Sequence, residues 1–125
     1  MEKKKILVID DEAGLTRMLK RVLEDTGKFE VKTENLGYDG LATARTFMPD
    51  LIILDVIMPD VEGGFLAAQI KEDAQLKSIP IVFFTATATK EDTAAYRGVI
   101  GGYPFLAKPV TVNELLACIK KVLGK

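Results

Sequence analysis

Four aliphatic residues run directly into one carboxylate in the stretch Leu51-Ile52-Ile53-Leu54-Asp55-Val56-Ile57-Met58-Pro59. An apolar run this short, between Pro49-Asp50 and Pro59-Asp60, predicts a strand buried on both faces, as in a parallel sheet covered by helices. Asp55 is then the first residue at the carboxyl edge of the sheet, where open α/β sheets hold their ligands. Taken alone, Asp55 is better explained as the first residue of a turn, a common position for aspartate.

Composition limits the classes of protein to consider. The 125 residues are 48% hydrophobic and 28% charged, which suits one folded domain over residues 1–125. A net charge of -1 gives no reason to expect nucleic-acid binding, and the apolar runs are too short to span a membrane. The single cysteine suits a reducing cytoplasm. The absence of histidine excludes a histidine phosphocarrier and leaves chemistry to carboxylates, hydroxyls, lysines and oxygen-bound metal.

Polar residues also follow the other predicted strands. Residues 6–9 form an aliphatic run that ends in Asp10-Asp11, and residues 81–84 form another that ends at Thr85. A short strand over 105–107 is followed by Lys108. Residues 29–33 alternate apolar and polar side chains, which predicts a half-exposed edge strand.

Helices are predicted between these strands. The first has an apolar face at spacing 3–4 and is expected to end near Gly27; its solvated face is predicted to hold Thr16, Arg17, Lys20, Arg21 and Glu24. A second helix follows a turn over 35–39 and ends at Pro49. Gly63-Gly64 is expected to break the chain, and a third helix is expected to begin at Phe65 and to end near Asp73. A fourth is expected over 89–97. Thr111 and Glu114 form a capping box for the last, which places Cys118 in the core.

Strands and helices therefore alternate, with about five of each. This order predicts a doubly wound α/β fold with a five-stranded parallel sheet and helices on both faces. In such a sheet Asp10, Asp11, Asp55, Thr85 and Lys108 converge on one edge.

The chemistry of the converging residues points to phosphoryl transfer. Carboxylates that lie close together repel one another unless a cation offsets their charge, and Mg²⁺ suits such a cluster. Asp55 could act as a nucleophile, because aspartate carboxylates form acyl phosphates. Lys108 supplies a cation and Thr85 a hydroxyl donor for phosphoryl oxygens.

At these residues the chain resembles the receiver domain of two-component response regulators over essentially its whole length. The residues that carry the resemblance are Asp10-Asp11, residues 55–59 with Gly63, Thr85-Ala86 and Lys108-Pro109. The resemblance implies a flavodoxin-like sheet of strand order 2-1-3-4-5. The chain departs from the family at Gly101-Gly102-Tyr103-Pro104, where the family often has Gly-Ala-Asp-Asp.

The resemblance also implies roles for single residues. Asp55 is the phosphoacceptor, and Mg²⁺ is held by Asp10, Asp11, Asp55 and the backbone carbonyl of Ile57. Thr85 binds the phosphoryl group and moves on activation, Lys108 pairs with that group, and the Lys108-Pro109 bond is cis. Phe105 is the aromatic residue that turns inward when Thr85 moves. Glu12 is expected to begin a helix rather than to bind the metal.

The expected function is a phosphorylation-dependent switch rather than an enzyme, beyond its own phosphorylation and dephosphorylation. A sensor histidine kinase or histidine phosphotransfer protein would supply the phosphoryl group, and the surface of the fourth helix, fifth strand and fifth helix would respond. The alternative is an interaction module of the same fold that does not use phosphorylation. A hydrolase is disfavoured because Val56-Ile57 follow Asp55 where a second carboxylate would be needed.

The sequence allows two kinds of downstream partner. The 125 residues contain no output domain, so the chain either acts alone on a downstream protein or belongs to a longer regulator. Either a monomer or a phosphorylation-linked dimer is compatible with the sequence.

Overall fold

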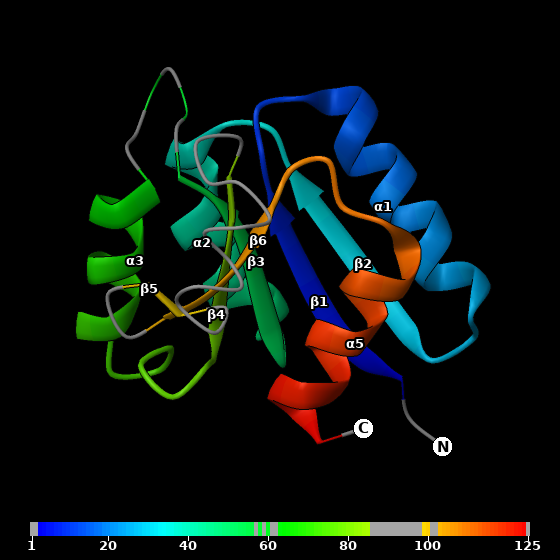
Figure 1. The fold of residues 1–125 in the computed structure, drawn as a ribbon. Coiled ribbons are helices and arrows are strands. Elements are labelled where there is room, and N and C mark those ends of the chain that lie inside the picture. The colour runs from blue at the N-terminus through cyan, green and yellow to red at the C-terminus, as the bar shows by residue number, and fades with distance from the viewer. Residues whose placement is uncertain are drawn as a thin grey trace.

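The structure, a computed structural model, describes residues 3–56, 58, 60, 63–85, 99–100 and 103–124 of the chain. Strands and helices alternate along most of these residues (Figure 1). The strands are β1 (Lys4–Ile9), β2 (Phe29–Glu34), β3 (Leu51–Asp55), β4 (Ile81–Thr85), β5 (Val99–Ile100) and β6 (Tyr103–Ala107). The helices are α1 (Ala13–Asp25), α2 (Gly37–Phe47), α3 (Gly63–Glu72) and α5 (Val112–Leu123). None of the helices described is long and apolar enough to cross a bilayer.

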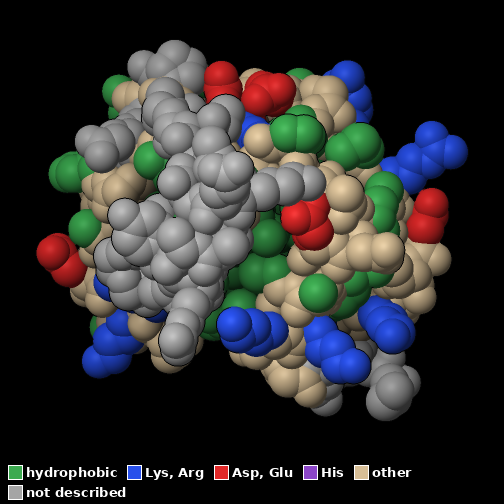
Figure 2. All heavy atoms as spheres, viewed as in Figure 1, with side chains coloured by type: hydrophobic (Ala, Val, Ile, Leu, Met, Phe, Trp, Pro, Cys, Tyr) green, Lys and Arg blue, Asp and Glu red, His purple; other side chains and the backbone are tan. Residues whose placement is uncertain are grey.

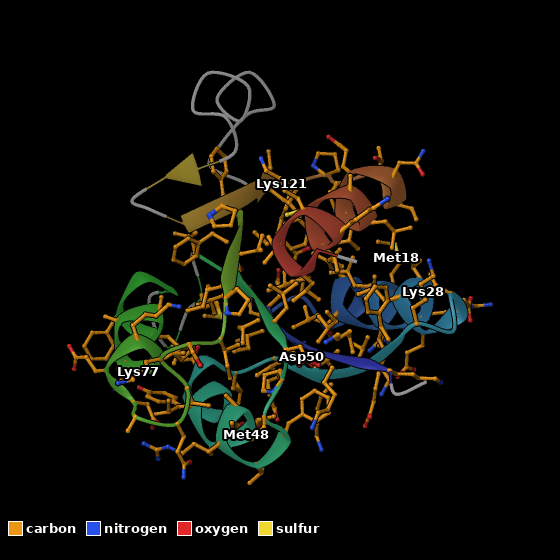
Figure 3. All side chains as sticks on the ribbon, turned by 90° about the horizontal axis from the view of Figure 1, so that it is seen from below. Met18, Lys28, Met48, Asp50, Lys77 and Lys121 are labelled. Atoms are coloured by element: carbon orange, nitrogen blue, oxygen red, sulfur yellow. The ribbon has the colours of Figure 1, made fainter. Side chains whose placement is uncertain are left out.

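The described strands form one sheet in the order β2-β1-β3-β4-β6-β5. All pairs from β2 to β6 are parallel, so these five strands have the predicted 2-1-3-4-5 order, with β6 as the fifth parallel strand. Asp50, labelled in Figure 3, fixes the start of β3 against β1. Its Oδ2 accepts a hydrogen bond from Lys5 N at 2.8 Å, and its own N donates to Lys5 O at 2.7 Å.

Helices cover both faces of the sheet, as the sequence predicts. In Figure 3, α1 and α5 lie on one side, while α2 and α3 lie on the other. Successive side chains of a strand point to opposite faces, so β1 contributes Ile6 and Val8 to one core and Leu7 and Ile9 to the other. All of β3 is buried, which confirms that the central aliphatic run is a strand covered on both faces.

Helix ends follow the local signals in the sequence. Gly27 lies just past α1 with φ of 76°, a left-handed conformation that glycine adopts without strain. The Thr111–Glu114 capping box begins α5, with Glu114 N donating to Thr111 Oγ1 at 3.1 Å and Thr111 N donating to Glu114 Oε1 at 2.9 Å. Cys118 is half-buried beside the core, in keeping with its predicted place on the apolar face of α5.

The turn predicted over 35–39 is shorter than expected, because α2 already begins at Gly37. Leu36, the residue before this helix, provides no side-chain cap. The Tyr38 amide instead donates to Asp60 Oδ2 at 3.1 Å, across the sheet edge from the connection after β3. A distant carboxylate thus satisfies one of the unpaired amides of the first turn, which local sequence does not reveal.

A two-residue strand, β5, was not predicted. Val99 and Ile100 pair antiparallel with Pro104 and Tyr103 of β6 and extend the sheet by one edge strand. Gly101-Gly102, the dipeptide between them in sequence, is a type that commonly joins paired strands. This pairing includes Tyr103 and Pro104, two of the residues at which the sequence departs from the family. The helix predicted over 89–97 lies outside the described residues.

Candidate functional site

Three carboxylates meet at the carboxyl edge of the sheet. Asp10 and Asp11 follow β1, and Asp55 ends the neighbouring β3; one carboxylate oxygen from each lies within 4.8 Å of the others. Asp10 is fully buried and Asp55 is 4% exposed, whereas Asp11 is exposed. Figure 2 shows acidic side chains at the upper edge of this view, above the strand ends of Figure 1. The predicted acidic cluster is therefore present and reaches solvent on the Asp11 side.

Lys108 brings a cation to the same edge from the far side of β4. Its Nζ lies 2.7 Å from Asp10 Oδ2 and 3.7 Å from Asp55 Oδ2. The ring centroid of Phe84 lies 5.0 Å from the same ammonium, within the range of a cation–π contact. The Lys108-Pro109 bond is cis, as the family resemblance implies.

Electrostatics keep Lys108 charged. Burial of the ammonium lowers the pKa of Lys108, but hydrogen bonds to the Asp10 and Glu12 carboxylates and the charges of Asp10 and Asp55 outweigh it. The pKa of Lys108 therefore lies above its ordinary value. Lys108 is consequently an ammonium throughout the neutral pH range and can balance negative charge next to Asp55.

Thr85 ends β4, the strand beside β3, and is 4% exposed. Its carbonyl accepts a hydrogen bond from Lys108 N at 2.9 Å, so the backbone ties the two predicted site residues together. Phe105 lies two residues before Ala107, the register partner of Thr85, and is 2% exposed. The ring of Phe105 is thus already inside the core, so the inward turn implied by the resemblance would move it within the core.

Two residues that the sequence did not single out support Asp10. Asn35, just after the edge strand β2, donates from Nδ2 to Asp10 O at 2.8 Å and to Thr16 Oγ1 at 2.9 Å. Thr16 is 1% exposed, so its prediction as part of the solvated face of α1 was wrong. It is buried because it accepts the Asn35 bond and donates to Ala13 O at 3.0 Å.

Glu12 was expected to begin a helix, and it does occupy the position before α1. Its backbone N donates to Asp10 Oδ1 at 2.9 Å. Its side chain makes no cap hydrogen bond; instead, Lys108 Nζ donates to Glu12 Oε1 at 3.1 Å. The sequence contains no local signal for this pair, because 96 residues separate its members.

The structure thus brings together Asp10, Asp11, Asp55 and Lys108 around one point, with Thr85 joined to Lys108 through the backbone. Ile57, the predicted backbone ligand, lies outside the described residues, as does Ala86 of the family motif. The arrangement offers a nucleophilic carboxylate, hard oxygen ligands for a divalent cation, and the positive charge of the Lys108 ammonium.

Comparison with known proteins identifies the family. The model of the response regulator receiver domain matches residues 6–120. The chain is 34% identical over 120 residues to the protein PilH of Pseudomonas aeruginosa, covering 96% of this chain and 98% of PilH. It is 31% identical over 121 residues to the polar-differentiation response regulator DivK of Brucella anthropi, with 97% of each chain covered. Some relatives are longer: the chain spans about half (52%) of the response regulator Rre1 of Synechocystis, at 32% identity over 96% of this chain.

Solved structures agree with the fold. The chemotaxis protein CheY4 of Vibrio cholerae has a TM-score of 0.83 and 30% sequence identity, covering 98% of this chain and 100% of CheY4. Together with the sheet order and the acidic edge, these matches leave one assignment: the chain belongs to the response regulator receiver domain family, whose members are signalling domains of two-component systems.

Proposed function

We propose that this chain is a phosphorylation-dependent signalling switch in which Asp55 accepts the phosphoryl group. The observation that carries the proposal is the position of Asp55, which ends β3 with its Oδ2 3.7 Å from the Lys108 ammonium and beside Asp10 and Asp11. Formation of an acyl phosphate requires a nucleophile and groups that offset the negative charge of the phosphoryl oxygens. The Asp55 carboxylate is the nucleophile, and the Lys108 ammonium and a cation held by the neighbouring carboxylates would offset that charge.

The carboxylates fit a magnesium ion. The ammonium of Lys108 pairs with Asp10, Glu12 and Asp55, and Asp11 adds a fourth carboxylate beside Asp10 and Asp55, so negative charge is in excess among the described residues of the site. Oxygen ligands of this kind suit Mg²⁺, which binds through a few carboxylates and retains its waters. Asp10, Asp11, Asp55 and the carbonyl of Ile57 would hold the ion. When bound, Mg²⁺ would offset the carboxylate charges and stabilise charge on the phosphoryl oxygens.

The phosphoryl donor is a histidine of another protein, a sensor kinase or a phosphotransfer protein, since this chain has no histidine. A carboxylate oxygen of Asp55 forms a bond to phosphorus as the phosphorus–nitrogen bond of the donor breaks. The electron pair of the broken bond passes to the imidazole, which then takes up a proton. Lys108 balances charge on the phosphoryl oxygens, and the Thr85 hydroxyl donates a hydrogen bond to them.

Phosphorylation then shifts the conformational equilibrium. The group adds charge and three acceptor oxygens at Asp55, so a state in which Thr85 and Lys108 face Asp55 gains affinity that the other state lacks. Movement of Thr85 changes the packing beside Phe105 in β6. The surface of the predicted fourth helix, β6 and α5 would change with it and present the signal to a downstream protein or to an output domain in a longer chain.

Acetyl phosphate tests the proposal. Incubation with Mg²⁺ and acetyl phosphate should add one phosphoryl group, measured by intact mass, to the wild type and none to Asp55→Ala. Asp39→Ala, an exposed aspartate in the first turn of α2, provides the control and should be phosphorylated as the wild type is. A folded wild type that stays unmodified would instead favour the interaction module that does not use phosphorylation.

A further inference from the structure

The ammonium of Lys108 is shared unequally among three carboxylates. Its Nζ lies 2.7 Å from Asp10 Oδ2, 3.1 Å from Glu12 Oε1 and 3.7 Å from Asp55 Oδ2. The cation is therefore held on the side of the site formed by the residues after β1. Under the proposed function, Lys108 balances charge at Asp55, yet Asp55 is the most distant of its three carboxylate partners.

Glu12 differs from the other two partners in its surroundings. Its side chain is 61% exposed, whereas those of Asp10 and Asp55 are buried. It precedes α1 without capping the helix, and the hydrogen bond from its backbone N to Asp10 Oδ1 fixes it beside the site. The contact that the structure describes for its carboxylate is the pair with Lys108.

The pair borders open space. Glu12 and Lys108 line a cavity of about 390 Å³, together with apolar side chains of α1 and residues 109–110. Phe84 also lines this cavity, and the Lys108 ammonium lies over its ring. The Lys108 side chain can therefore change direction without displacing a packed neighbour on the cavity side.

We propose that Glu12 is a positioning residue that holds the Lys108 ammonium on the Asp10 side, a contact that Lys108 gives up when it pairs with a phosphoryl group on Asp55. The inference rests on the proposed function and adds to it a residue that opposes phosphorylation. Glu12 competes with the phosphoryl oxygens for the same cation, and its charge also repels the incoming anion.

The two ligands of the site should respond to Glu12 in opposite directions. In Glu12→Gln, Lys108 keeps its contact with Asp10 but loses its second partner, and the repulsion of the anion by Glu12 is lost. Beryllofluoride should therefore bind about two- to fivefold more tightly at saturating Mg²⁺, the size expected of an exposed ion pair. Mg²⁺ alone should bind about twofold more weakly, since a nearby negative charge is removed. A general loss of structure would weaken both ligands together.

The experiment is a beryllofluoride titration followed by fluorine NMR, with Mg²⁺ affinity measured separately by calorimetry. Glu30→Gln removes the same charge from an exposed site at the opposite end of the sheet, paired in register with Lys5, and should leave both affinities unchanged. Raising NaCl from about 0.1 M to about 1 M should shrink the difference between Glu12→Gln and the wild type, because salt screens an exposed pair.

Equal beryllofluoride affinities for wild type and Glu12→Gln, or a weaker affinity in the variant, would overturn the role of Glu12 while leaving the proposed function intact. A wild type that fails to bind beryllofluoride, or an Asp55→Ala variant that binds it equally well, would overturn both. The wild type and Asp55→Ala together therefore distinguish a failure of the proposed function from a failure of the Glu12 role alone.

Discussion

Gly63 packs against the backbone carbonyl of Asp55 so closely that a β-carbon on Gly63 would overlap that oxygen and lie 2.7 Å from Cα of Val56. Gly63 N also donates to Val56 O at 2.8 Å. The start of α3 is thus pressed onto the backbone that carries the proposed phosphoacceptor. This close approach explains the glycine. The three atoms nearest to an added β-carbon all belong to the backbone of Asp55 and Val56, and backbone atoms cannot move aside as the end of a flexible side chain can.

Gly63→Ala should therefore lower both stability and phosphorylation. The atoms in conflict belong to the backbone, so β3 or α3 must shift, and we expect a loss of about 1–3 kcal/mol in the free energy of unfolding, measured by urea denaturation. Gly14→Ala in α1 is the matched control, because the nearest atom to its added β-carbon is an arginine nitrogen at 4.0 Å. Equal stability of both variants would contradict the packing described.

Asn35→Ala should lower stability and weaken Mg²⁺ binding, although Asn35 is not itself one of the proposed metal ligands. The variant leaves Asp10 O and Thr16 Oγ1 without their 2.8 and 2.9 Å donors near buried Asp10, at an expected cost of about 1–3 kcal/mol. Weaker Mg²⁺ binding, measured by calorimetry, should accompany the loss. Asn113→Ala, at an exposed position of α5, should change stability by less than about 0.5 kcal/mol. Unaltered Mg²⁺ affinity in Asn35→Ala would show that this amide does not position the acidic cluster.

The thiol of Cys118 should be poorly reactive in the folded protein. Burial raises its pKa, an effect that the charge of Lys121 only partly offsets, so the thiolate is scarce near pH 8. Alkylation by iodoacetamide at pH 8 should be about tenfold slower, or more, than in the same protein unfolded in guanidinium. Because the pKa is raised on folding, stability from the neutral thiol is present at low pH and lost as pH rises through the folded pKa. Equal rates in the two states would contradict a buried thiol.

The parts of the fold that the sequence predicts are those set by local pattern. The aliphatic run before Asp55 and the capping box at Thr111 are both visible in a few consecutive residues and both hold in the structure. The convergence of Asp10 and Asp55 follows equally from strand order, because parallel strands end at one edge.

The contacts that sequence reasoning missed join residues far apart in the chain. Thr16 is polar and lies on the same predicted helix face as charged residues of α1, so periodicity places it in solvent. Its hydroxyl instead accepts a hydrogen bond from Asn35, 19 residues away, which satisfies this polar group in its buried position. The Glu12–Lys108 pair spans 96 residues in the same way. Such pairs depend on tertiary geometry, which a single sequence does not contain.

The most direct measurement of the central claim locates the phosphoryl group in the chain. After incubation with Mg²⁺ and acetyl phosphate, borohydride reduction of an aspartyl phosphate yields homoserine, which peptide mass spectrometry assigns to one residue. We predict homoserine at Asp55, and at neither Asp10 nor Asp11, with the modification lost when Mg²⁺ is chelated. Homoserine at another aspartate, or none in a protein shown to be folded, would contradict the assignment of Asp55 as phosphoacceptor.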